Sequence, residues 1–250
     1  MKISAIHIGR VSIPLKRPFK TALRRVDSAE DIVIRIEADS GEVGFGNAPP
    51  TAVITGDSQD SIVAAIRDTL GPRLIGQDVE NLEAIMGLLD AGMLHNHSAK
   101  AALDIAVYDL FARRFGMPLY KFFGGYRTAF ETDLTISLNA PDEMVRDALS
   151  AVGEGYTALK LKVGNDPALD FARVRAIREA IGAGVAIRLD ANQGWGAKEA
   201  VRIIRRFEAE GLGIELIEQP VKAHDLEGLK YVTDHVETDI MADESAFGPY

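Results

Sequence analysis

The sequence predicts an α/β protein in which an N-terminal α+β unit, residues 1–125, precedes a partial (β/α) barrel, residues 126–250. Short β-rich runs begin near residues 133, 158, 186, 213 and 238, at intervals of 25 to 28 residues. Amphipathic helical stretches separate these runs, and such alternation at a near-constant period is typical of parallel β/α units. No glycine-rich phosphate loop follows any run, which weakens a nucleotide-binding, doubly wound interpretation.

The N-terminal unit begins with strands and continues with helices. Residues 3–13 and 31–38 show the apolar alternation of strands, and a turn at residues 39–41 precedes a return strand over 42–45. Three helices are expected next. The first is capped by residues 57–60 and ends near Gly71-Pro72, the second spans about 80–94, and the third is capped by Ser98 and ends near residue 116.

Five strands are fewer than a closed barrel of this type requires. A complete barrel has eight β/α units in about 250 residues, whereas the β-rich runs after residue 131 number five. An open barrel leaves two strand edges and an uncovered interior. The chain is therefore either shortened or completed by units from elsewhere, and the sequence leaves both alternatives open.

Composition limits the class of function. The chain carries 28 Lys and Arg against 37 Asp and Glu, a net charge of −9, which disfavours a nucleic-acid partner. It has no cysteine, which excludes disulfides, thiolate metal sites and a cysteine nucleophile. No apolar run reaches the roughly 18 residues of a membrane span, and the N-terminus reads as a strand rather than a signal peptide. We expect a cytoplasmic protein with no membrane partner.

Three consecutive strand ends each carry one acid: Asp190 in RLDAN, Glu218 in LIEQP and Asp243 in MADES. Glu218 follows Asp190 by 28 residues and Asp243 follows Glu218 by 25, which is one β/α unit each. We expect the three carboxylates at one height, on the face where barrel enzymes place their sites. A hard divalent cation, Mg²⁺ first, would relieve their repulsion. Taken singly, each acid could equally be a helix cap or a surface residue.

The strand before these acids ends in Lys160-Leu161-Lys162. Residues i and i+2 of a strand point the same way, so both lysines are expected to face the barrel interior. Their mutual repulsion and a nearby metal should lower the pKa of each, so that one serves as a neutral base near pH 7. The alternative is a solvated edge from which two lysines reach water.

Other polar residues are weaker candidates. Thr135 lies on the first barrel strand, where a hydroxyl could bind a substrate amide or simply favour a strand. Arg24 and Arg25 lie in a polar loop, where they could clamp a carboxylate or be solvated. The five histidines form no convincing site and are interpreted as structural or exposed.

With these motifs assembled, the chain resembles the muconate-lactonizing branch of the enolase superfamily, and within it dipeptide epimerases of the L-Ala-D/L-Glu type. The resemblance covers essentially the whole chain. It is carried by PFKTALR (18–24), APPTAVITGD (48–57), LKLKVG (159–164), LDANQGW (189–195), GIELIEQP (213–220) and IMADES (240–245).

The resemblance implies a role for each candidate. Asp190, Glu218 and Asp243 match Mg²⁺ ligands, Lys162 matches the base that takes the substrate α-proton, and Lys160 matches a lysine that helps neutralise the enediolate. Thr135 and Arg24 match substrate-binding positions, with Arg24 gripping an acidic side chain in a loop of the N-terminal capping domain. The loop at residues 53–57 would close the same pocket.

Two departures from the family pattern stand out. Asn47 replaces an expected glutamate, which should alter packing or loop closure. The family's second catalytic lysine, on a sixth barrel strand, and an acidic motif on the eighth have no counterpart in the 250 residues. We therefore expect residues 1–250 alone not to catalyse net epimerisation.

The leading hypothesis is a Mg²⁺-dependent isomerase that epimerises small dipeptides such as L-Ala-L-Glu through an enediolate, as a homo-oligomer. One alternative is a neighbouring enzyme of the same branch: an N-acylamino acid racemase, an o-succinylbenzoate synthase or a muconate cycloisomerase. The other is a non-catalytic fragment that binds metal.

Overall fold

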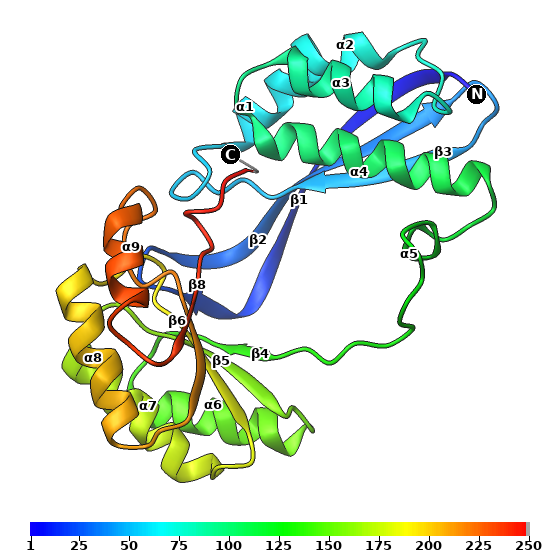
Figure 1. Cartoon of the computed structure of the whole chain (residues 1–250). Helices are drawn as coiled ribbons and strands as arrows, with labels where there is room; N and C mark the ends of the chain where they lie inside the picture. Colours follow the sequence, from blue (N-terminus) through cyan, green and yellow to red (C-terminus); the bar gives the residue numbers. More distant parts are fainter. Residues whose placement is uncertain (249–250) are drawn as a thin grey trace. The chain divides into compact units, whose positions relative to one another are not determined.

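The computed structural model describes residues 1–248, whose contacts divide into two compact units (Figure 1). The first unit comprises Met1–Lys16 and Ser28–Phe130. The second comprises Arg17–Asp27 and the chain from residue 131 onward. The chain therefore leaves the first unit after residue 16, contributes the segment 17–27 to the second, and returns at residue 28.

The first unit contains a three-stranded sheet in the order β1-β2-β3. Its strands are β1 (Ile3–Lys20), β2 (Arg25–Ala38) and β3 (Val43–Ala48), and β2 pairs with β3 antiparallel. Ile32, Ile34 and Ile36 are fully buried, as their alternation predicts. β1 and β2 extend beyond their predicted ranges because residues 14–20 and 25–30 contain no buried residue, and so lack the buried apolar face that alternation reports.

Six helical segments follow this sheet: α1 (Gln59–Ala64), the π-helix η1 (Ala65–Leu70), α2 (Gly71–Leu74), α3 (Leu82–Gly92), α4 (His97–Arg114) and α5 (Leu119–Phe122). The expected helix end at Gly71-Pro72 is wrong, because proline is tolerated in a first helical turn and here opens α2. The expected cap at Ser98 is also wrong. α4 begins one residue earlier, and the Ser98 N–H donates to the Asp57 carboxylate at 3.3 Å.

Helix α4 packs closely on β3. A Cβ atom at Gly44 or Gly46 would collide with the α4 backbone, so this approach requires glycine at both positions. Beside them, Asn47 donates from Nδ2 to Asp31 Oδ2 at 2.7 Å. Asparagine therefore supplies a donor to a neighbouring carboxylate at the position where a glutamate is expected from the family pattern.

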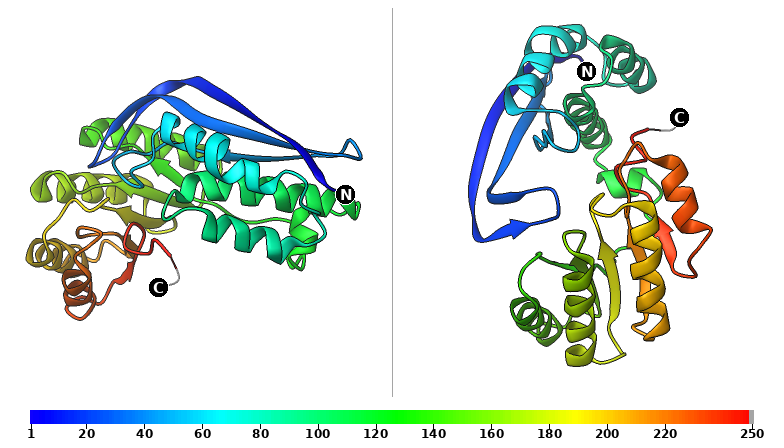
Figure 2. Two further views of the ribbon diagram at one scale, coloured as in Figure 1. Left: turned by 90° about the horizontal axis from the view of Figure 1, so that it is seen from above. Right: turned by 90° about the vertical axis from the view of Figure 1, so that its left-hand side faces the viewer.

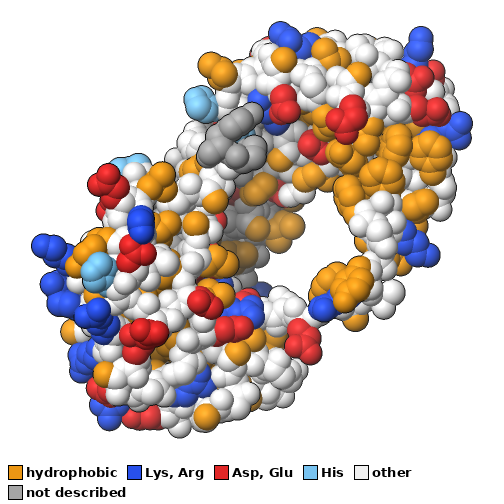
Figure 3. Space-filling view, viewed as in Figure 1, with side chains coloured by type: hydrophobic (Ala, Val, Ile, Leu, Met, Phe, Trp, Pro, Cys, Tyr) orange, Lys and Arg blue, Asp and Glu red, His pale blue; other side chains and the backbone are white. Residues whose placement is uncertain are grey.

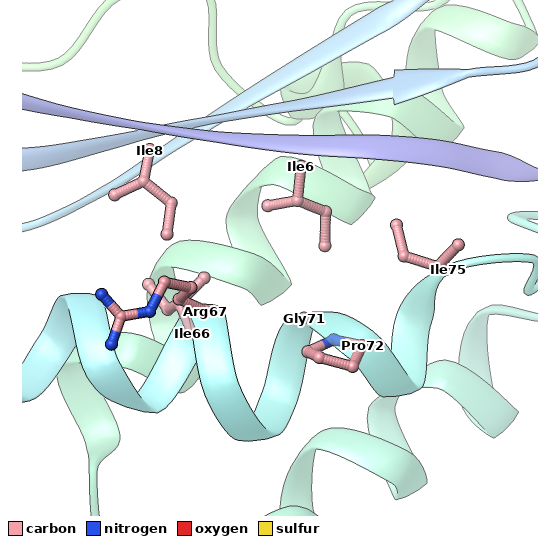
Figure 4. A pocket seen from close by; sticks show the side chains of 7 residues that line it. All are labelled: Ile6, Ile8, Ile66, Arg67, Gly71, Pro72 and Ile75. Carbon is pink, nitrogen blue, oxygen red and sulfur yellow. The ribbon is translucent and has the colours of Figure 1, made fainter.

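The first unit holds an apolar pocket of about 400 Å³ between β1 and the η1–α2 segment (Figure 4). Ile6 and Ile8 point into it from the strand, and Ile66 and Ile75 close it from the opposite side. Its one charged lining residue, Arg67, is paired with its neighbour Asp68. The pocket lacks an acid–base pair and is not the candidate active site.

Aromatic side chains cluster where α4 ends and α5 follows. Figure 3 shows hydrophobic side chains gathered over this part of the first unit. Phe111 lies 5.0 Å from Phe115 and 5.3 Å from Phe122 between ring centroids, and Phe123 packs on Tyr108. Phe115 and Phe123 are exposed, so the cluster forms an apolar surface on the first unit.

The second unit contains five parallel strands in sequential order. They are β4 (Leu134–Ile136), β5 (Ala158–Lys162), β6 (Ala186–Asp190), β7 (Ile214–Glu218) and β8 (Asp239–Met241). The intervening helices are α6 (Pro141–Gly153), α7 (Pro167–Ile181), α8 (Ala197–Ala209) and α9 (Leu226–Thr233). The helices line one face of the sheet (Figures 1 and 2). This partial barrel after an α+β unit confirms the predicted fold class.

The core of the second unit lies between the sheet and these helices. Leu161, Leu189 and Ile217 are fully buried on that face. The rings of Phe171 and Phe207 stack beside them at 5.9 Å. The residues that alternate with these side chains therefore point to the other face, the barrel interior.

A single arginine secures the loops at the amino end of this sheet. Arg178 of α7 donates to the carbonyl oxygens of Leu212 (2.8 Å), Gly182 (2.7 Å), Val185 (2.7 Å) and Gly213 (3.0 Å). Burial lowers its pKa. The guanidinium thereby joins the α7–β6 connection to the α8–β7 connection.

Candidate active site

The candidate site lies at the carboxyl ends of β5, β6 and β7. The parallel register places Lys162 opposite Asp190 and Asp190 opposite Glu218. Paired residues in neighbouring strands point to the same face, and here that face is the barrel interior. All three side chains are nonetheless buried. Of the three acids expected at one height, the register therefore brings Asp190 and Glu218 together, beside Lys162.

Four charged groups form a compact ion-pair network. Lys162 Nζ lies 2.5 Å from Asp190 Oδ2. Lys160 Nζ lies 3.1 Å from the same oxygen and 2.6 Å from Glu218 Oε2. The Lys160 ammonium therefore bridges two carboxylates whose mutual repulsion would otherwise drive them apart.

The network determines the pKa shifts of its members. Burial raises the pKa of Glu218, the charges of Asp190 and Asp243 raise it further, and the bond from Lys160 only partly offsets them. Burial lowers the pKa of Lys160, but the bond to Glu218 and the charges of Asp190 and Glu218 outweigh burial, so the net pKa is raised. The expectation of a lowered pKa is therefore wrong for Lys160, because two carboxylates lie within ion-pair distance of its ammonium.

Asp243 does not lie at the same height as the other two acids. Glu218 pairs with Met241, the last residue of β8, so Asp243 falls in the loop beyond the strand. Its backbone N–H donates to Gln219 Oε1 at 2.9 Å, and the residue is exposed. Over residues 1–248, no three acidic or histidine side chains stand close enough to hold a metal ion in their present positions.

The donor chemistry around these residues nevertheless fits a hard divalent cation. Asp190 and Glu218 offer buried carboxylate oxygens on adjacent strands. Two further oxygens in the same loops, Asn192 Oδ1 and Glu244 Oε2, are buried without a hydrogen-bond partner. Buried oxygens without a partner are costly in a protein interior, and an all-oxygen donor set is what Mg²⁺ prefers.

The expected substrate-binding residues lie in the same unit. Thr135 pairs with Lys160 in the β4–β5 register and shares its face. Arg24 lies in the loop at residues 21–24, where its N–H donates to Thr21 Oγ1 at 3.3 Å. The preceding segment is tied to β4, because the Lys20 N–H donates to Ser137 Oγ at 2.7 Å.

Phe19 in that segment faces the site. Its ring centroid lies 5.9 Å from Lys162 Nζ, within cation–π range. The loop at residues 53–57 belongs to the first unit, where its Asp57 is buried.

Several site residues escape the sequence analysis. Gln219 and Asn192 lie one and two residues after Glu218 and Asp190 but are neutral amides, which spacing arguments overlook. Asp170 is fully buried on α7 and accepts from Gly164 N at 2.9 Å and Trp195 Nε1 at 3.3 Å. It thereby joins the loops that follow β5 and β6. The tryptophan in LDANQGW is the sequence signal that could have pointed to this link.

A partial barrel with lysines on one strand and acids on the next two defines a class of protein. Comparison with known protein families identifies this class. Residues 4–124 match the mandelate racemase / muconate lactonizing enzyme N-terminal domain, and residues 143–250 match the enolase C-terminal domain-like family. The chain belongs to the mandelate racemase / muconate lactonizing enzyme family of the enolase superfamily.

Several of its similar relatives are epimerases. The L-Ala-D/L-Glu epimerase of Clostridium acetobutylicum is 55% identical over 249 residues, covering 100% of this chain and 70% of the relative. The substrate-liganded L-Ala-D/L-Glu epimerase of Bacillus subtilis is 53% identical with a TM-score of 0.98, covering 100% and 70%. The Enterococcus faecalis dipeptide epimerase, solved with Mg and L-Leu-L-Tyr, is 43% identical with a TM-score of 0.95, covering 99% and 69%.

These relationships establish the general class of the protein as an isomerase of the racemase and epimerase type. Among residues 1–248, no helix combines the length and apolarity needed to cross a membrane.

Proposed function

We propose that the protein is a Mg²⁺-dependent epimerase of small dipeptides of the L-Ala-L-Glu type. The observation that carries this proposal is the register of Lys162, Asp190 and Glu218 on three adjacent strands, with Lys160 bridging the two acids. Relatives more than 50% identical over the whole chain are L-Ala-D/L-Glu epimerases. We also propose the Mg²⁺ ligands to be Asp190, Glu218 and Asp243.

The chain's own residues account for proton removal and charge stabilisation. Lys162, in its uncharged form, takes the α-proton from the C-terminal residue of the dipeptide. Lys160 places its ammonium beside the carboxylate oxygens that gain charge in the resulting enediolate. Mg²⁺, when bound, would act as a Lewis acid toward that same charge. Burial of the network strengthens these interactions because it excludes water.

Substrate orientation falls to residues of the first barrel strand and of the segment 17–27. Thr135 shares the face of Lys160, from which its hydroxyl would bind the peptide amide. Arg24 would bind the acidic side chain of the dipeptide through charge-assisted hydrogen bonds. Epimerisation also needs an acid on the opposite face of the α-carbon, which the family resemblance assigns to a lysine on a sixth barrel strand. Cytoplasmic location and homo-oligomerisation stay predictions.

A second candidate is racemisation of N-succinylated amino acids. The N-succinyl-L-Arg/Lys racemase of Bacillus cereus is 34% identical over 246 residues. The L-Ala-D/L-Glu epimerase of Clostridium acetobutylicum is more similar, at 55% identity, and this difference in identity favours a dipeptide substrate.

Exchange of the α-proton with solvent tests the proposal directly. The protein is incubated in D₂O with Mg²⁺ and either L-Ala-L-Glu or N-succinyl-L-arginine, and proton NMR follows loss of the α-proton signal. We expect faster exchange with the dipeptide, and its loss in Lys162→Met. Faster exchange of the succinylated substrate, or an unchanged rate in Lys162→Met, would refute the assignment.

A further inference from the structure

Gln219 directly follows Glu218 and is completely buried. Its Oε1 accepts the backbone N–H groups of Asp243 (2.9 Å) and Ser245 (3.0 Å). Its Nε2 donates to the Val221 carbonyl (2.9 Å) and to Ser245 Oγ (2.8 Å). The amide therefore makes all four hydrogen bonds available to it.

These bonds begin where the β-ladder stops. β8 has three residues and lies at the end of the strand order. Its last ladder bond runs from the Gln219 N–H to the Met241 carbonyl at 2.9 Å. Beyond that point, the Gln219 side chain takes the place of a neighbouring strand, because Asp243 and Ser245 both donate to it.

The backbone at Gln219 is unusual for the position. Its φ of +38° lies in the left-handed region, which is energetically unfavourable for any residue that has a side chain. Asn192 and Gln193, just after Asp190, share this feature with φ values of +41° and +67°. The chain therefore turns sharply after both strand-end acids, and the buried bonds of Gln219 help to hold one of these turns.

We propose that Gln219 is a positioning residue that fixes the Asp243 loop against Glu218 so that the acids can share one divalent cation. The inference rests on the metal site of the proposed function and deepens it. Gln219 does not itself touch the cation. It acts through the Asp243 backbone, and the exposed Asp243 carboxylate depends on that anchor for its position.

Mg²⁺ affinity of the purified 250-residue chain tests the inference without any need for turnover. Affinity is measured by calorimetry and by the fluorescence of Trp195, which is the only tryptophan. Gln219→Leu removes all four side-chain bonds. Gln219→Asn keeps an amide and suits a left-handed backbone, but it is too short to reach Asp243. Far-UV circular dichroism and thermal melting identify the variants that fold.

Gln193→Leu is the matched control. Gln193 lies in the loop after β6, and its Oε1 accepts the Ala223 N–H at 2.9 Å rather than a backbone N–H of Asp243 or Ser245. We expect the Kd for Mg²⁺ to rise about tenfold in Gln219→Leu and Gln219→Asn, and to stay within about twofold in Gln193→Leu. Asp243→Asn should raise the Kd by itself. Because Gln219 acts through Asp243, adding Gln219→Asn to the Asp243→Asn variant should raise the Kd little further.

Each result leads to a decision. A folded Gln219→Asn with wild-type affinity overturns the positioning role and leaves the proposed metal site intact. An equal loss in Gln193→Leu, or full additivity with Asp243→Asn, also overturns the role, because both indicate general loosening of the loops. Wild-type affinity in Asp243→Asn refutes the metal assignment itself, and the positioning role with it.

Discussion

Removing the guanidinium of Arg178 should destabilise the second unit by about 2–4 kcal/mol. Arg178→Met keeps the aliphatic stem and leaves four backbone carbonyls without their donor. Two of these bonds, to Leu212 and Val185, are part-buried, and a charged donor contributes about 1.5–3 kcal/mol to each such bond. The exposed bonds to Gly182 and Gly213 add less, because water replaces the donor. Burial lowers the Arg178 pKa, which means that the buried charge carries a free-energy cost. Removing the guanidinium removes this cost and offsets part of the lost stability.

Urea unfolding followed by Trp195 fluorescence measures this cost in the unit that contains Arg178. Arg175→Met is the control on the same helix, since Arg175 forms an exposed pair with Glu179 and exposed pairs contribute at most about 1 kcal/mol. If Arg178→Met unfolds at the same urea concentration as Arg175→Met, the four carbonyl bonds do not hold the two connections together.

Three further outcomes follow from the site and the fold. Asp190→Asn and Glu218→Gln, like Asp243→Asn, should each weaken Mg²⁺ binding sharply, and unchanged calorimetric affinity in two of the three would mean that the metal lies elsewhere. Arg24→Ala in a complete enzyme should raise KM for L-Ala-L-Glu about 10- to 150-fold, from a lost charge-assisted bond of about 1.5–3 kcal/mol. L-Ala-L-Leu should be spared, and equal losses for both dipeptides would contradict a side-chain role. Gly46→Ala should lower the melting temperature because its Cβ has no room against α4. Gly41→Ala, whose Cβ meets open space but whose φ is +92°, tests backbone strain without a clash.

Strand periodicity and the spacing of acids predict the second unit well because both arise from one constraint. Each β/α unit returns the chain to the same edge of the sheet, so Lys162, Asp190 and Glu218 must align once the repeat is recognised. The same reasoning overestimates the regularity at β8. Counting residues assigns Asp243 to the strand end, whereas the structure ends the strand at Met241. Spacing along the chain does not report where a ladder stops pairing.

The remaining features depend on contacts between distant residues, which a single sequence does not display. Neutral amides such as Gln219 and Asn192 carry no charge pattern, although their buried atoms support the site. The raised pKa of Lys160 follows from two carboxylates on other strands, not from its neighbour Lys162. The extension of β1 to Lys20 follows from pairing rather than from apolar alternation.

The assignment of residues 17–27 to the second unit affects how the protein can be dissected. No single cut in the chain separates the two units, because a fragment starting near residue 131 lacks the segment that binds Ser137 and Asn139 through Lys20. A fragment ending near residue 130 keeps that segment without its partners. Separate expression therefore requires either circular permutation or a peptide of residues 17–27 added in trans. Restoration of native chemical shifts at β4 by such a peptide would show that this short segment is an integral part of the barrel unit.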